Sequence, residues 1–100
     1  MYQVMIDAYS IMYSSNTFHP RISLLAEGKY VAQLIFMPNG HDLPEDAVVE
    51  SEHRMFYHLE NYQHIADLLG KGKPLQLIFN GSGGGNENCL HLVREDLTAH

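Results

Sequence analysis

Three histidines and two carboxylates lie close together in the sequence, where they could bind a metal ion: His53, His58, His64, Glu60 and Asp67. His53 and His58 have opposite parity on the strand predicted there, so their side chains point to opposite faces of a sheet. The chain has no HExxH motif, and one cysteine cannot build a thiolate zinc site. The pattern predicts no metal site within one chain, and it leaves open a site shared between two subunits.

Cys89 and His91 could form a thiol–imidazole pair, because alternate residues of a strand share one face. Catalysis by such a pair needs hydrogen-bonding distance and an activated thiolate. Residues two apart on a strand lie about 6–7 Å apart at the backbone, so this spacing does not supply the contact. No serine lies in a nucleophile-elbow motif either. The sequence therefore predicts no catalytic residues and no enzyme.

The glycine-rich run GSGGG, residues 81–85, could cradle a phosphate group. A phosphate loop presents backbone N–H groups at a helix N-terminus, usually with a nearby lysine. This run lies between two predicted strands, contains no lysine and is followed by Glu87. We interpret it as a flexible hairpin loop, and the sequence predicts no cofactor.

The composition indicates one small acidic domain spanning residues 1–100. Of the 100 residues, 45% are hydrophobic and 18% are charged, which suits a single globular core. Six Lys and Arg against twelve Asp and Glu give a net charge of −6 at pH 7. Phosphates and anionic membranes are bound by clustered positive charge, so this balance argues against membrane contact and disfavours nucleic acid. Core packing explains the strand aromatics better than base stacking does.

Cysteine content and the N-terminus bear on the cellular compartment. One cysteine, Cys89, cannot form an intrachain disulfide, which favours a reducing compartment. The N-terminal sequence MYQVMIDAYS lacks the basic and apolar regions of a signal peptide. No run approaches the roughly twenty apolar residues that cross a bilayer. We expect a soluble cytoplasmic protein, and protonating its seven histidines would move the net charge from −6 to +1.

The stretch 54–79 predicts the helix that positions the other elements. It reads as a strand, one amphipathic helix and a second strand. After a favourable N-cap at Asn61, apolar residues recur with helical spacing at Tyr62, Ile65, Ala66 and Leu69. Gly70 and Pro74 end the helix. At about ten residues, it is too short to be stable alone and must dock on a sheet.

Alternation and aromatic content predict the strands. We expect strands at 2–9, 53–59, 75–80 and 88–93, and a hairpin over 21–37 with a two-residue turn at Glu27-Gly28. Residues 10–20 read as a loop or distorted strand end, 38–52 as a long acidic connection, and 94–100 as a fraying polar tail. The predicted fold is α+β, with an antiparallel or mixed sheet of five to six strands and one short helix packed on one face.

The predicted hairpin is apolar on both faces. Counting from the turn, Leu24 faces Val31 and Ile22 faces Gln33. One face then carries Leu25, Tyr30, Ala32, Leu34 and Phe36, and the other carries Ile22, Leu24, Val31, Ile35 and Met37. A helix of about 15 Å cannot cover a sheet about 24 Å wide, still less both of its faces.

The uncovered face predicts self-association, because exposed apolar patches of that size are unusual in monomers and symmetric dimers are the commonest assembly. The candidate homodimer interface is Ile22, Leu24, Val31, Ile35 and Met37. Alternatively, residues 10–20 and 38–52 fold over this face.

The sequence therefore favours a small non-enzymatic interaction or regulatory domain that acts as a homodimer. A protein partner would meet the surface near the helix and the acidic loop. The alternative is a small-ligand or metal-responsive binder that uses histidines at a dimer cleft. A single-stranded nucleic-acid binder is the third class, which the negative charge disfavours.

Overall fold

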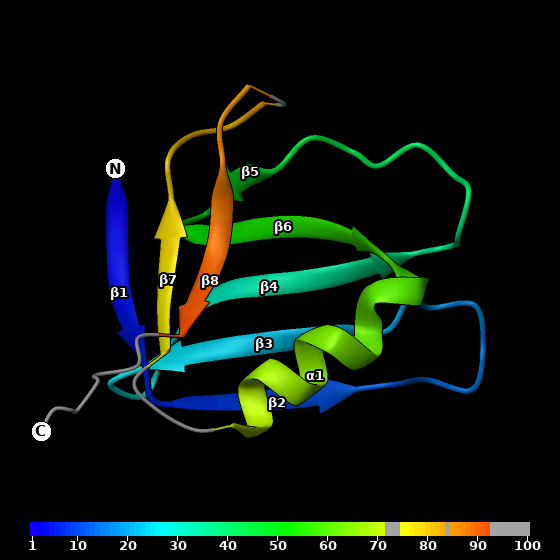
Figure 1. Ribbon diagram of the computed structural model, residues 1–100, viewed down its shortest axis with the longest axis horizontal. Helices are drawn as coiled ribbons and strands as arrows, with labels where there is room; N and C mark the ends of the chain where they lie inside the picture. Colours follow the sequence, from blue (N-terminus) through cyan, green and yellow to red (C-terminus); the bar gives the residue numbers. More distant parts are fainter. Residues whose placement is uncertain (72–74, 84, 93–100) are drawn as a thin grey trace, which may run out of the picture.

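Eight strands form two sheets in the part of the chain that the computed structural model describes, residues 1–71, 75–83 and 85–92 (Figure 1). A five-stranded mixed sheet has the order β2-β3-β4-β6-β5, from β2 (Ala8–Met12), β3 (Arg21–Ala26), β4 (Lys29–Met37), β6 (Glu52–His58) and β5 (Ala47–Val49). A three-stranded antiparallel sheet has the order β1-β7-β8, from β1 (Tyr2–Ile6), β7 (Leu75–Phe79) and β8 (Asn88–Leu92).

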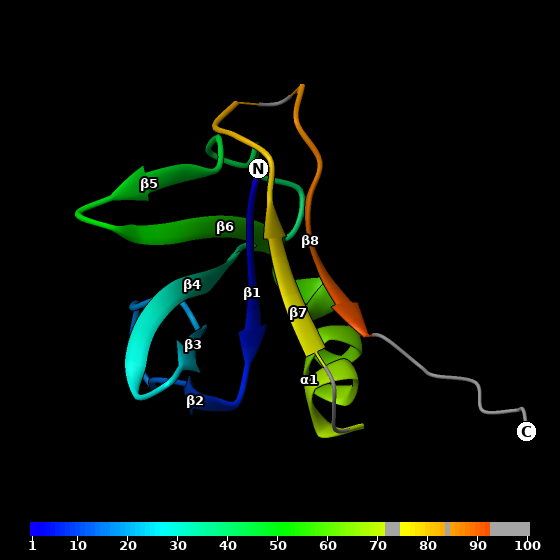
Figure 2. The same ribbon diagram turned by 90° about the vertical axis from the view of Figure 1, so that its left-hand side faces the viewer.

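The helical segment is a 3₁₀ turn (Leu59–Asn61) that continues into α1 (Tyr62–Gly70). The predicted α+β class, the mixed five-stranded sheet and the single helix are confirmed, whereas the second sheet was not predicted. Figures 1 and 2 place α1 and the three-stranded sheet on the same face of the five-stranded sheet. Pro74 and the tail 94–100 lie outside the described residues.

Asp7 divides the first predicted strand into two strands that belong to different sheets. Its backbone N–H donates to the Leu25 carbonyl at 3.0 Å, and its Oδ2 accepts the N–H of Glu27 at 2.8 Å. Both bonds attach the bend to the β3–β4 hairpin. The prediction of one strand over 2–9 was wrong, because the apolar alternation runs unbroken through the residue at which the chain changes sheet. β2 also occupies the start of the predicted loop.

The β3–β4 hairpin confirms the predicted turn but corrects its register. Glu27 and Gly28 have φ values of 53° and 79°, the positive pair that a type I′ turn requires. Leu25 pairs with Tyr30, yet Leu24 pairs with Ala32, so Val31 is an extra residue in β4. Such a β-bulge reverses the parity of every pair beyond it. The predicted pairs Leu24–Val31 and Ile22–Gln33 were therefore wrong.

The connection predicted over 38–52 contains an edge strand. β4 and β6 are parallel neighbours, and β5 pairs antiparallel with β6 on its far side. The turn between β5 and β6 is formed by Glu50 and Ser51, with positive φ values of 52° and 71°. Within the predicted connection, residues 47–49 thus extend the sheet at its edge.

The helix docks as its apolar stripe predicted. Leu69 is buried, and Tyr62, Ile65 and Leu68 pack against the core. Asn61 stands at the N-cap position without a capping side-chain bond. Instead, Asn39 Oδ1 accepts the backbone N–H of Glu60 at 2.7 Å, at the start of the 3₁₀ turn. A loop residue far away in sequence therefore satisfies this helical end.

The core lies between the two sheets and the helix. Its buried members are Ile6, Ile22, Leu24, Ala32, Leu34, Phe36, Met55, Leu69, Leu75, Leu77 and Phe79. Residues from both sheets and from α1 share this one cluster, so each element buries its apolar side against the others. Among the described residues, no helix is long and apolar enough to cross a membrane.

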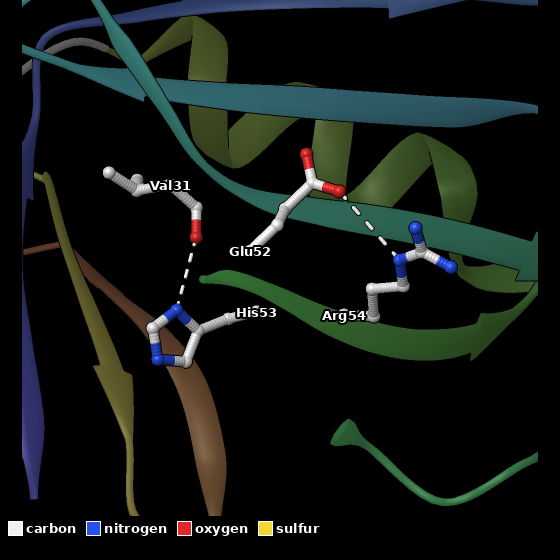
Figure 3. Close-up of polar contacts among 4 residues, drawn as sticks. All are labelled: Val31, Glu52, His53 and Arg54. Carbon is white, nitrogen blue, oxygen red and sulfur yellow. Dashed lines mark hydrogen bonds and ion pairs between the residues drawn. The ribbon is translucent and has the colours of Figure 1, made fainter. Parts of the chain in front are cut away.

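His53 is a buried polar residue where the two sheets meet. Its ring stacks on Tyr2 of β1 at a centroid distance of 4.2 Å and meets the edge of Phe79 of β7 at 4.6 Å. Its Nδ1 lies 3.1 Å from the Val31 carbonyl oxygen (Figure 3). A carbonyl only accepts, so Nδ1 carries the hydrogen and donates. The bond satisfies one buried polar atom of this side chain.

Candidate functional site

The structure divides the five candidate interface residues between different environments. Ile22 and Leu24 are fully buried in the core. Val31 is half-buried and packs against the core, while Ile35 and Met37 are half-buried members of β4 outside the core cluster. The bulge at Val31 explains the division, because it puts Ile22 and Ile35 on opposite faces. The five residues therefore do not form one surface, and a contact between Ile35 or Met37 and a second copy stays a prediction.

The outer face of the five-stranded sheet, opposite the core, is mixed rather than apolar. Ile35 pairs with Arg21 and Phe56. A polar row lies beside it, because Gln33 pairs with Ser23 and Arg54. All of these residues are half-buried. Neighbouring side chains already cover much of this face, so it is weaker as an interface than the sequence suggested.

Arg54 and Glu52 form an ion pair on this outer face. Arg54 Nε lies 3.7 Å from Glu52 Oε1 (Figure 3). The side chains retain 39% and 25% of their exposure, although Arg54 Nε itself is buried without a hydrogen-bond partner among the described residues. Because 3.7 Å is too long for a hydrogen bond, the pair contributes little to stability. The outer face thus carries charge on β6, beside the edge strand β5.

Exposed apolar side chains concentrate at the N-terminus. Of the twelve large apolar residues exposed in the described part of the chain, eight lie within the first eighteen residues. They are Met1, Tyr2, Met5, Tyr9, Ile11, Met12, Tyr13 and Phe18. Half of this set, Tyr9, Ile11, Met12 and Tyr13, lies on β2 or directly after it. We call residues 8–13, AYSIMY, the β2 edge.

The β2 edge has none of the usual features that block strand addition. β2 pairs only with β3, and every one of its five residues is exposed. Residues 8–13 contain no charged residue and no proline. Natural edge strands are commonly blocked by lysine, proline, a bulge or a covering element. Tyr13 meets Tyr62 of α1 edge-on at a centroid distance of 5.5 Å, which attaches the end of this edge to the helix.

The histidines are dispersed over the molecule. His19, His41, His64 and His91 are exposed, and His58 is half-buried. His58 Nε2 donates a hydrogen bond to the carbonyl oxygen of His41 at 2.7 Å. Within residues 1–71, 75–83 and 85–92, no three His, Cys, Asp or Glu side chains lie close enough to hold a metal ion.

Cys89 is half-buried on β8 and has the environment of a structural thiol. Burial raises the pKa of the Cys89 thiol, and the charge of Glu87 raises it further. A nucleophilic cysteine needs the opposite shift, because the thiolate is the reacting species. The environment of Cys89 thus favours the unreactive protonated form at neutral pH.

Tyr57 and Asp46 lie where β6 meets β8. Burial raises the pKa of the Tyr57 hydroxyl, and the charges of Asp46 and Cys89 add to this effect. Asp46 Oδ1 accepts the backbone N–H of Phe56 at 3.0 Å, and its Oδ2 accepts the Asn88 side-chain amide at 2.9 Å. Asp46 therefore joins the two sheets through hydrogen bonds, which gives this acidic group a structural role.

The glycine-rich segment lies between β7 and β8, as the hairpin interpretation required, with Gly84 outside the described residues. Asn88 closes the loop: its Oδ1 accepts the Asn80 N–H at 2.6 Å and its Nδ2 donates to the Gly81 carbonyl at 3.0 Å. The loop runs into a strand, so it lacks the helix N-terminus that phosphate binding uses.

Comparison with family models, curated proteins and solved structures finds no match to this chain. The described residues form an α+β fold of two sheets and one helix, and β2 is an exposed, uncharged edge strand of the larger sheet. The β2 strand was not predicted beyond residue 9, because residues 10–20 read as a loop or a distorted strand end. The available signal was the uncharged run AYSIMY, rich in residues that favour strands.

Proposed function

We propose that this protein is a non-enzymatic interaction domain that acts as a homodimer. The exposed, uncharged β2 edge is the observation that carries the proposal. Edge strands of this kind add further strands from other chains, because their backbone donors and acceptors are unpaired on one side. A second protein can then bind the assembled dimer, so regulation by dimerisation is part of the proposal.

Charge supports a second copy as the partner. The chain carries a net charge of −6, so two copies repel one another over most orientations. A symmetric interface brings a surface patch against itself, which is unfavourable for an acidic patch. The β2 edge contains no charged residue, so two copies can meet there without opposing like charges. A single half-buried cysteine is compatible with a reducing cytoplasm, where we place the protein.

Sedimentation velocity across a wide range of protein concentration tests the homodimer. We expect the sedimentation coefficient to rise with concentration from the monomer value to a plateau at the dimer value. A strict monomer at the highest concentrations would overturn the proposal. Adding zinc, nickel or copper should leave the melting temperature unchanged, whereas a clear rise would instead support the metal-responsive alternative.

A further inference from the structure

We propose that two copies pair their β2 strands antiparallel, edge to edge, so that two five-stranded sheets become one continuous sheet. This inference rests on the proposed homodimer and identifies its interface. β2 is the terminal strand of the sheet and contacts β3 on one side only (Figure 1). Alternate residues of a strand direct N–H and C=O groups to either side, so the free side of β2 presents unpaired backbone groups.

When two copies of β2 pair antiparallel, each face of the strand can continue into the same face of the strand in the second copy. Tyr9 and Ile11 pair with the buried residues Leu24 and Ile22 of β3, so both lie on the core side of the sheet. A twofold axis perpendicular to the sheet and passing beside Ser10 keeps this side common to both copies. Tyr9 then faces Ile11 of the partner subunit, and the same contact repeats across the axis.

This register uses the whole strand. Centred on Ser10, all five residues of β2 find a partner, whereas a shift by two residues would leave three pairs. Aromatic–aliphatic pairs opposite one another across strands are among the stabilising combinations. Ala8 would face Met12 of the partner subunit on the outer side, so no charged residue enters the contact.

The opposite edge of the sheet explains why association stops at two. β5 is only three residues long, whereas β2 has five. Very short edge strands resist strand addition. Within the five-stranded sheets, pairing of β2 with β2 uses the longer edge of each copy and closes this contact, whereas β2-to-β5 contacts would extend the sheet without limit.

Matched lysine substitutions test the location of the interface. Ile11 on β2 and Val48 on β5 are 43% and 47% exposed, lie on opposite edge strands and both pair with residues of the core side. We expect Ile11→Lys to raise the dimer dissociation constant at least about tenfold, because an edge lysine blocks strand pairing. Val48→Lys should leave the dissociation constant unchanged, and far-UV circular dichroism should show both variants folded.

The outcomes separate the two proposals. A monomeric wild-type protein would overturn the homodimer and the β2 pairing together. A wild-type dimer whose dissociation constant is unchanged in Ile11→Lys would overturn the β2 pairing alone. Assemblies that keep growing with concentration would overturn closure at two copies.

Two further experiments test the register, and the second, which uses cysteine variants, remains informative if Ile11→Lys fails to fold. Adding Tyr9→Glu to Ile11→Lys puts opposite charges at facing positions, so the double variant should regain dimer that the single variant lost. In a Cys89→Ser background, oxidised Ser10→Cys should form a covalent dimer faster than Val48→Cys, since residues facing across strands lie within disulfide range. Equal cross-linking of both cysteine variants would overturn the register.

Discussion

At the scale of single residues, His53 shows how a polar side chain can serve the core. It lies between Tyr2 and Phe79, which belong to two strands of the three-stranded sheet, while its own strand belongs to the five-stranded sheet. The Val31 carbonyl that it contacts belongs to the bulge in β4. His53 therefore packs both sheets together and hydrogen-bonds the irregular part of one of them.

Replacing this ring should destabilise the protein. We expect His53→Ala to lower the free energy of unfolding by about 2–3 kcal/mol, because it leaves a cavity and an unpaired Val31 carbonyl. His64→Ala, at an exposed helix position, is the control and should change stability by less than about 0.5 kcal/mol. Urea denaturation monitored by circular dichroism measures both. Equally small losses of unfolding free energy in the two variants would show that His53 does not stabilise the contact between the two sheets.

The raised pKa of Tyr57 predicts sensitivity to alkali. The folded protein holds this proton more tightly than the unfolded chain does. Its contribution to stability is therefore complete below the ordinary tyrosine pKa, about 10, and is lost as pH rises above it. The wild-type protein should unfold at a lower urea concentration at about pH 11 than at about pH 8. This difference between the two urea midpoints should be smaller in Tyr57→Phe. An unchanged difference between the two pH values would contradict this.

At the scale of elements, two hairpin turns have the same backbone pattern but different residues. Glu27-Gly28 and Glu50-Ser51 each have two positive φ angles, and only the first contains glycine. Positive φ is strained for residues with a Cβ atom. The β5–β6 turn is therefore less favourable locally, and pairing between its strands maintains it.

Substitutions in these turns should have opposite effects. Ser51→Gly should raise the free energy of unfolding by about 0.5–1 kcal/mol because it relieves strain at φ 71°. Gly28→Ala should lower it by about 1 kcal/mol, although the added methyl would meet no atom within 4 Å, since the cost is conformational. Thermal denaturation of both variants tests this. A destabilised Ser51→Gly would indicate that the serine makes an unseen favourable contact.

Single substitutions in β4, beyond its bulge, can test the two faces of the five-stranded sheet one at a time. Leu34 is fully buried, whereas its neighbour Ile35 is half-buried on the outer face. Leu34→Asp should unfold the protein, because it puts a charge into the core. Ile35→Asp should remain folded and, with β2 as the interface, dimeric. A folded monomer from Ile35→Asp in sedimentation would instead place the interface on the outer face.

At the scale of the whole molecule, most of the exposed large apolar side chains belong to the first eighteen residues of an acidic chain. The net charge of −6 supports solubility, while the exposed apolar residues gather at one end of the sequence. β2 and β1 are both edge strands without a charged residue, and two copies can approach at such an edge without opposing like charges. The proposed association at the β2 edge is consistent with this distribution, and the outer face of the sheet carries the Arg54–Glu52 pair.

Local patterns in the sequence were enough to predict much of the fold. The stripe of Tyr62, Ile65 and Leu69 predicted the docked helix, and Glu27-Gly28 predicted the hairpin turn. Both depend on residues close together in the chain, so periodicity and backbone preference determine them. Residue types alone also show that one chain, with a single cysteine, cannot supply the several thiolates of a zinc–thiolate site.

Contacts between residues far apart in the chain determine which residues face the core and which edge is free. Nothing local marks Asp7 as the point where the chain changes sheet, because its hydrogen bonds join residues about twenty positions away. The bulge at Val31 likewise accompanies non-local pairing with β3 and a bond from His53. Since one inserted residue reverses strand parity, this bulge moved Ile22 and Leu24 into the core. The free β2 edge depends on strand order, which pairing across the whole chain determines.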